Sequence, residues 1–139
     1  MDYLLKMNSV NNRKLRKFKL KGIKVNNKRL YFGFYGLITL ETGRIDSKVF
    51  KSLVDIVKRK IKSKGGGKFW FYLNQSIPVT QLSIGTRMGK GKGNIAKQVS
   101  FVRKGQIICE LSLNNQEDAL DVLKIAASKL PVKAKIIKY

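Results

Sequence analysis

Residues 46–73, DSKVFKSLVDIVKRKIKSKGGGKFWFYL, contain a helix signal followed directly by a strand signal. Asp46 is a residue type that caps helices, and the apolar residues after it recur at three- and four-residue spacing, as on one buried helix face. These residues are Val49, Phe50, Leu53, Val54, Val57 and Ile61. Cations near residue 60 suit the negative end of a helix dipole, and the glycines at 65–67 suit its C-cap. We therefore predict a helix between Asp46 and these glycines.

The strand signal, residues 68–73, has a large side chain at every position after Lys68. Large residues on both faces predict a strand that lies centrally in a sheet and is covered on both sides. The alternative is a platform on which bases stack. The cations do not alternate with the rings as on a single-strand-binding sheet, so a core role is favoured.

Further strands are predicted on both sides of this unit. Residues 30–40 are rich in aromatic and β-prone residues and are interrupted by glycines, which predicts a strand with a bulge or a close backbone approach. For their aromatic residues, a place in a plain core strand is favoured over a binding role. Pro78 is expected to close a turn after residues 74–76, before a short strand at 79–84.

Two strand-like runs lie further along the chain, at 99–102 and 107–111. They flank Arg103-Lys104-Gly105-Gln106, and this spacing predicts a hairpin. Cys109 in the second run is interpreted as a small core residue and not as a nucleophile, because the chain has no second cysteine and no histidine.

A second helix is predicted to begin at Asn114 or Asn115, with Glu117 and Asp118 in its first turn and Pro131 beyond its end. Its inward residues are expected to be Ala119, Leu120, Leu123, Ala126, Ala127 and Leu130. A final strand at 132–137 completes a single domain over residues 30–139. The predicted fold class is α+β, with an antiparallel or mixed sheet on which two helices pack.

The charge balance is the strongest functional signal in the composition. The chain has 30 Lys and Arg against 8 Asp and Glu, a net charge of +22, and its pI is about 10.4. Self-repulsion on this scale destabilises a compact fold unless a polyanion neutralises it. Nucleic acid is the best-suited partner, and an anionic membrane surface is the second candidate. Residues 3–40 and 56–109 contain no acid, so they form the candidate contact surface.

The amino-terminal residues 1–29 are predicted to form a basic arm. Cations between Arg13 and Arg29 are too dense, with too little apolar periodicity, for an amphipathic core helix, so we expect an extended arm that orders on a partner. A targeting peptide has similar composition, but we interpret the segment as a retained arm. Its candidate RNA-binding cations are Arg13, Lys14, Arg16, Lys17, Lys19, Lys21 and Lys24.

A second basic segment, Arg87-Met88-Gly89-Lys90-Gly91-Lys92-Gly93, sets glycines and cations alternately. Glycine adopts positive φ without a Cβ penalty and allows close backbone approach, while each Lys or Arg adds a charge-assisted contact to phosphate. The segment therefore predicts a phosphate-binding loop between strands. The alternative is an ordinary solvated basic loop.

Motifs for catalysis or metal binding fail in this sequence. Gly85-Thr86-Arg87-Met88-Gly89-Lys90-Gly91 has three residues between Gly85 and Gly89 where a P-loop needs four, and it ends in glycine where the P-loop has the hydroxyl for magnesium. Without histidine, with one cysteine and with no carboxylate pair beside the loop, neither a triad nor a zinc site can form. We expect no enzymatic activity, no cofactor, no metal and no small-molecule substrate.

The segment Arg87-Met88-Gly89-Lys90-Gly91-Lys92-Gly93-Asn94 resembles the signature of the universal large-subunit ribosomal protein family called L-sixteen in bacteria and L-ten-e in eukaryotes. Similar pieces in family order are Phe32-Gly33 through Gly36-Leu37, Gly43-Arg44-Ile45, Gly67-Lys68-Phe69-Trp70 and Lys129-Leu130-Pro131-Val132-Lys133. The chain departs from the bacterial pattern at Ile95-Ala96-Lys97-Gln98 and at Gly65-Gly66-Gly67, and residues 1–11 lie outside the match.

The resemblance implies an α+β domain among large-subunit rRNA helices, with the basic loop reaching toward tRNA near the peptidyl transferase centre. It also implies neighbouring ribosomal proteins as partners and phosphate contacts from the loop cations. The candidate RNA-binding set adds to the arm these residues: Arg44, Arg87, Met88, Gly89, Lys90, Gly91, Lys92 and Gly93.

The expected function is that of a structural rRNA-binding constituent of the large ribosomal subunit that helps to position tRNA. The alternative is a free-standing nucleic-acid-binding or architectural protein. Membrane binding is disfavoured because both predicted helices need their apolar faces for the core. Abundant Lys, Asn and Ile are typical of an AT-rich organelle genome, so we expect the mitochondrial matrix, with plastid or bacterial cytoplasm as alternatives.

Overall fold

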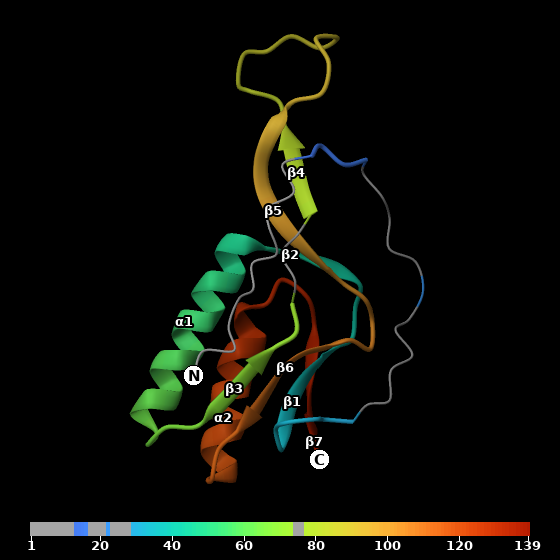
Figure 1. The fold of residues 1–139 in the computed structure, drawn as a ribbon. Helices are drawn as coiled ribbons and strands as arrows, with labels where there is room; N and C mark the ends of the chain where they lie inside the picture. Colours follow the sequence, from blue (N-terminus) through green and yellow to red (C-terminus); the bar gives the residue numbers. More distant parts are fainter. Residues whose placement is uncertain (1–12, 17–21, 23–28, 74–76) are drawn as a thin grey trace.

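The computed structural model describes residues 13–16, 22, 29–73 and 77–139. The described residues form two helices and seven strands (Figure 1). In chain order they are β1 (Tyr35–Thr39), β2 (Gly43–Asp46), α1 (Ser47–Ser63), β3 (Lys68–Phe71), β4 (Ile77–Gln81), β5 (Asn94–Val102), β6 (Ile107–Ser112), α2 (Gln116–Lys129) and β7 (Ala134–Lys138). The predicted α+β class is confirmed.

The strands divide between two antiparallel sheets, where the sequence predicted one. The larger sheet has the order β3-β6-β1-β7, and the smaller has the order β2-β5-β4. Side chains of both helices form one hydrophobic core with the inner strands β1 and β6. In Figure 1, α1 and α2 lie to one side of the larger sheet, while β4 and β5 extend away from it.

Helix α1 confirms the apolar pattern of its sequence. Phe50, Leu53, Val54, Val57 and Ile61 are buried, and Val49 is partly buried against them. The helix ends where the backbone N–H groups of Lys64 and Gly66 donate to the Ile61 carbonyl oxygen at 3.2 and 3.0 Å. The C-cap residue itself is Lys64, and the predicted glycines follow it, beginning with Gly65 at φ of 86°.

The start of α1 is at the predicted residue, but the side chain of Asp46 does not have the predicted capping role. Asp46 occupies the N-cap position, yet its side chain makes no capping hydrogen bond. Its carboxylate instead accepts a hydrogen bond from Lys97 Nζ of β5 at 2.7 Å. The acid therefore joins the beginning of α1 to the smaller sheet.

Strand β3 lies at the edge of the larger sheet, so its predicted central position is wrong. Its large side chains are covered by other segments and not by a further strand. Phe71 packs edge-on against Phe50 of α1, with ring centroids 5.0 Å apart, while Trp70 stacks on Phe32 at 5.7 Å. Large residues on both faces thus indicate coverage from both sides, which an edge strand can also have.

The predicted hairpin at 99–111 is also wrong. β5 pairs with β2 and β4, whereas β6 pairs with β1 and β3, so Arg103–Gln106 connect two sheets. The buried Thr39 holds this connection, because its hydroxyl donates to the Arg103 carbonyl oxygen at 2.6 Å and its carbonyl oxygen accepts from Gly105 N–H at 2.8 Å. Contacts distant in sequence therefore decide the path.

Strand β1 covers only the second half of the predicted strand at 30–40. Both predicted irregularities are present. Its register with β6 shifts between Leu37 and Ile38, and a Cβ on Gly33 would lie 2.7 Å from the Leu111 carbonyl oxygen. Residues 30–34 therefore approach β6 closely without forming a strand.

Strand β4 begins at Ile77 and contains Pro78, which the sequence assigned to a turn; the rest of that turn, residues 74–76, lies outside the described residues. Proline is tolerated because β4 is an edge strand.

Helix α2 is capped by Asn115, whose side-chain oxygen accepts from Glu117 N–H at 3.2 Å. Its buried residues are Ala119, Val122, Leu123 and Ala126, of which Val122 was not predicted; Leu120, Ala127 and Leu130 are partly buried. No helix among the described residues has the length and apolar character to cross a membrane.

Candidate nucleic-acid interface

The basic segment from Arg87 to Gly93 lies in the loop of residues 82–93, which joins β4 to β5 and projects beyond both sheets (Figure 1). Residues 82–92 are all exposed, including the apolar side chains of Ile84 and Met88. The loop begins where β4 and β5 separate, beyond the pairing of Gln81 with Asn94. Its cations are therefore accessible to a large partner.

Two kinds of glycine shape this loop. Gly89 and Gly91 have φ of 94° and 85°, in the left-handed region that favours glycine, and a Cβ at either position would meet no atom within 4 Å. A Cβ on Gly93 would instead lie 2.3 Å from the Gln81 carbonyl oxygen. The first two glycines allow the chain to turn, while Gly93 allows the two strands to close at the root.

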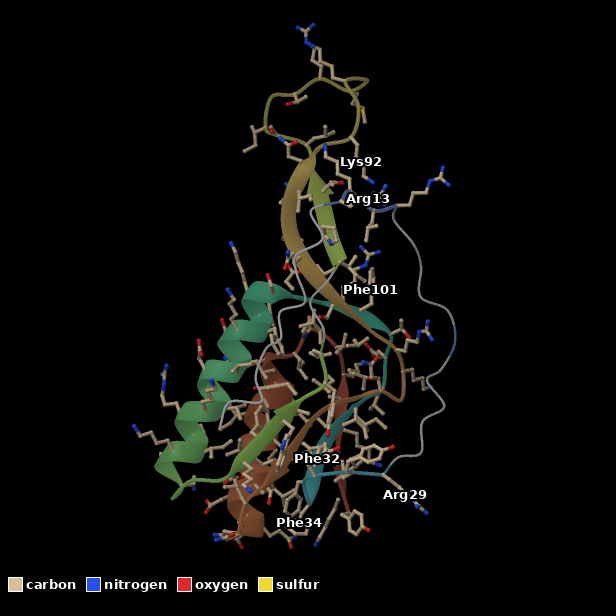
Figure 2. All side chains as sticks on the ribbon, viewed as in Figure 1. Arg13, Arg29, Phe32, Phe34, Lys92 and Phe101 are labelled. Atoms are coloured by element: carbon tan, nitrogen blue, oxygen red, sulfur yellow. The ribbon has the colours of Figure 1, made fainter. Side chains whose placement is uncertain are left out.

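Residues 13–16 lie beside the root of the loop, and Figure 2 shows Arg13 next to Lys92. Lys14 Nζ donates to the Lys92 carbonyl oxygen at 3.1 Å, and Lys92 Nζ donates to the Leu15 carbonyl oxygen. The structure thus brings three predicted arm cations, Arg13, Lys14 and Arg16, to the same place as the loop.

Lys14 Nζ and Lys92 Nζ are bonded to backbone carbonyl oxygens and not to carboxylates, so their positive charge is not neutralised there. Among the described residues the ion pairs lie elsewhere, and they are Lys64–Asp118, Lys97–Asp46, Lys124–Asp121 and Lys133–Glu41. A concentration of unneutralised cations on an exposed projection attracts a polyanion. These cations can therefore bind a phosphate backbone without first breaking an ion pair with a carboxylate.

The other predicted residues are placed differently. Arg44 lies on β2 and not on the loop, with its guanidinium 5.0 Å from the centroid of the Phe101 ring of β5. Lys17, Lys19, Lys21 and Lys24 lie outside the described residues. The cations at the end of α1 are exposed. Lys64, which follows the helix, pairs with Asp118, and this pairing raises the pKa of Lys64.

Sequence reasoning missed the role of Glu110, which is completely buried in β6. Its carboxylate accepts hydrogen bonds from the backbone N–H groups of Tyr31, Phe32 and Gly33 at 3.1, 2.7 and 2.9 Å. The pKa of the Tyr72 hydroxyl is raised, mainly by its burial and secondly by a hydrogen bond to Glu110. The available signal was an acid within the apolar run at 107–111, which demands a partner inside the fold.

Cys109 is fully buried in the core, as predicted, and this burial raises the pKa of its thiol to about 12. Such a thiol is a poor nucleophile because it stays protonated. Among the described residues no three His, Cys, Asp or Glu side chains gather as metal ligands.

Comparison with known proteins gives a consistent result over nearly the whole chain. The family described as ribosomal protein L16p/L10e matches residues 7–137. A protein of Corynebacterium diphtheriae is 38% identical over 117 residues, which cover 84% of this chain and 83% of that protein. A protein of Buchnera aphidicola from Cinara cedri is 36% identical over 121 residues, which cover 87% of each chain. Both are named large ribosomal subunit protein uL16.

Proposed function

The chain belongs to the ribosomal protein L16p/L10e family, and on that premise we propose that it is a structural constituent of the large ribosomal subunit that binds large-subunit rRNA and helps to position tRNA. Proteins of this family are structural constituents and not enzymes. The partners of this chain are therefore rRNA, neighbouring ribosomal proteins and, through the loop, tRNA.

The observation that supports RNA binding most directly is the cation cluster at the root of the loop. Lys14 Nζ donates to the Lys92 carbonyl oxygen and Lys92 Nζ to the Leu15 carbonyl oxygen, and among the described residues neither lysine forms an ion pair with a carboxylate. Each such cation that meets a phosphate releases counterions, which favours binding to RNA and makes it salt-dependent. Arg87 and Lys90 extend the same charge along the exposed loop. The tRNA contact rests on the resemblance of this loop to the family signature.

The proposal is tested by reversing charge in the loop with Lys90→Glu and Lys92→Glu together. Assembly of the large subunit, measured by sedimentation, or placement of tRNA, measured by translation, should be impaired. The matched control is Lys124→Glu with Lys129→Glu, which makes the same change of charge at exposed positions of α2. Subunits that assemble and translate normally with the loop pair reversed would refute the role of the loop.

Two alternatives are separated by simple measurements. A free-standing nucleic-acid-binding protein would not migrate with large particles on a sucrose gradient, whereas a ribosomal protein should. The compartment is proposed from composition as the mitochondrial matrix, while the relatives named above are bacterial. Mass spectrometry of purified mitochondrial ribosomes distinguishes a mitochondrial protein from one of the bacterial cytoplasm or plastid.

A further inference from the structure

A group of aromatic side chains is exposed at the end of the molecule opposite the loop, where Figure 2 shows Phe32 and Phe34. The exposed fractions are 72% for Tyr31, 64% for Phe32, 60% for Phe34 and 82% for Tyr139. Phe34 and Tyr139 are neighbours, because the Tyr139 N–H donates to the Phe34 carbonyl oxygen at 2.9 Å. Exposed apolar groups on this scale indicate a surface that a partner covers.

The backbone that carries these rings is fixed before any partner binds. The hydrogen bonds from the three backbone N–H groups of residues 31–33 to the buried Glu110 carboxylate hold these residues against the sheet, and Leu30, which precedes them, is buried. Rings held in this way lose little conformational freedom when they contact a ligand. The surface is therefore suited to direct recognition by its rings.

The Phe32 ring stacks on one neighbouring ring and is otherwise largely exposed. It lies on Trp70 with 5.7 Å between ring centroids and 27° between ring planes. Because most of Phe32 remains exposed, one further planar group can add to the stack. An RNA base is such a group, and stacking on aromatic side chains is how proteins bind unpaired bases.

The surrounding charge favours RNA over an apolar protein surface. Arg29 is exposed three residues before Phe32, and Figure 2 shows it at the same end of the molecule. Lys68 is exposed two residues before Trp70, so strand alternation places it on the same face of β3. The oxygens of Glu110, which lies opposite Trp70 in the sheet, are already occupied. The partner would therefore meet the exposed cations Arg29 and Lys68 beside the rings, while the buried carboxylate of Glu110 does not face it.

We propose that Phe32, stacked on Trp70, binds an unpaired RNA base, with Arg29 and Lys68 contacting the adjoining phosphates. This inference rests on the proposed function, because it supposes that RNA surrounds the protein. It adds a second contact at the opposite end from the loop, which recognises bases where the loop recognises phosphate.

The first test is ultraviolet crosslinking of the full chain within purified ribosomes, followed by mass spectrometry of its peptides. We expect nucleotide adducts on Phe32 as well as on the loop. Adducts on residues 82–93 without any on residues 29–34 would overturn the stacking site and leave the proposed function intact. Absence of adducts from both regions would count against both.

The second test measures binding of the full chain to a hairpin RNA that carries 2-aminopurine in its unpaired loop. Phe32→Leu, which keeps an apolar side chain but removes the ring, should weaken binding roughly tenfold. Phe32→Trp should retain both the affinity and the quenching of the probe. The matched control is Phe34→Leu, at a similarly exposed ring of the same segment, which should bind like the natural chain.

Equal losses from Phe32→Leu and Phe34→Leu would show a general apolar surface and overturn the stacking site. Unchanged RNA binding by Phe32→Leu would overturn it too, and impaired assembly of that variant with ribosomal proteins would then assign the rings to a protein partner. Lys90→Glu with Lys92→Glu should reduce the salt dependence of RNA binding, whereas Phe32→Leu should leave it unchanged. This difference separates failure of the inference from failure of the proposed function.

Discussion

The loop at 82–93 and the segment at 29–34 both present exposed side chains, but they are built in opposite ways. In the loop, a Cβ added at Gly89 or Gly91 would meet no atom within 4 Å, and the exposed side chains include several cations. The segment is fixed from beneath by a buried carboxylate and presents rings. The difference shows two routes to an exposed surface: a chain freed by glycine suits an irregular phosphate backbone, while a chain fixed by a buried acid suits a planar base.

The largest expected effect is on the fixed segment. Glu110→Ala should lower the free energy of unfolding by about 3 kcal/mol, because it leaves several backbone N–H groups without their acceptor. Urea denaturation measures this loss. Glu117→Ala removes an exposed acid and should cost about 0.5 kcal/mol or less. Equal stability of the two variants would mean that the segment is not held by Glu110, and the contrast with the loop would disappear.

The role of Glu110 also shows where sequence reasoning stops. The periodic apolar residues of α1 and the exposed glycine–lysine loop were predictable, because each depends on residues near one another in the chain. Glu110 depends on N–H groups almost eighty positions away, so no local pattern indicates it. The exposed rings were read as core for the same reason.

The division into two sheets was unpredictable for a related reason. The four residues between β5 and β6 have a spacing typical of a hairpin, but the two strands belong to different sheets, and Thr39 bonds to the connection from more than sixty positions away. At the candidate site, the loop cations were identifiable from their alternation with glycine. The contact between residues 13–16 and Lys92 could not be identified, because it joins residues almost eighty positions apart in the sequence.

A second prediction concerns the glycines of the loop. Gly93→Ala should destabilise the protein by about 2 kcal/mol, because the new Cβ would clash with backbone atoms of Gln81 and Leu82. Gly89→Ala adds a methyl group in open space and should cost about 1 kcal/mol, from the left-handed backbone alone. Urea denaturation of both variants tests the difference. A larger loss at Gly89 would mean that the tip of the loop, and not its root, is the constrained part.

A third prediction uses Cys109, which precedes Glu110 in β6 and is fully buried in the hydrophobic core. Burial raises the pKa of its thiol to about 12, whereas an exposed thiol in the unfolded chain titrates near its ordinary value. Above that ordinary value the unfolded chain binds fewer protons than the folded one, so stability falls as pH rises. Between pH 8 and 9.5 this group should contribute a loss of about 1 kcal/mol.

The measurement is urea denaturation of the natural chain and of Cys109→Ala across that pH range. The variant lacks the thiol, so the difference in stability between the two proteins should shrink as pH rises. A constant difference would show that the thiol reaches solvent in the folded protein. The hydrophobic core around β6 would then be as open to solvent as the loop.

The smallest effect tests how the hairpin that carries the loop is attached to the body. Asp46 pairs with Lys97 of β5 and does not cap α1, so Asp46→Asn and Asp46→Ala should cost the same, about 0.5 kcal/mol. A capping role would make them differ, because asparagine caps a helix almost as well as aspartate and alanine does not. High salt should reduce the loss if it comes from an exposed ion pair. Stability retained by Asp46→Asn but lost by Asp46→Ala would restore the cap, and the hairpin would then be joined to the body by β-sheet pairing with β2 and not by this ion pair.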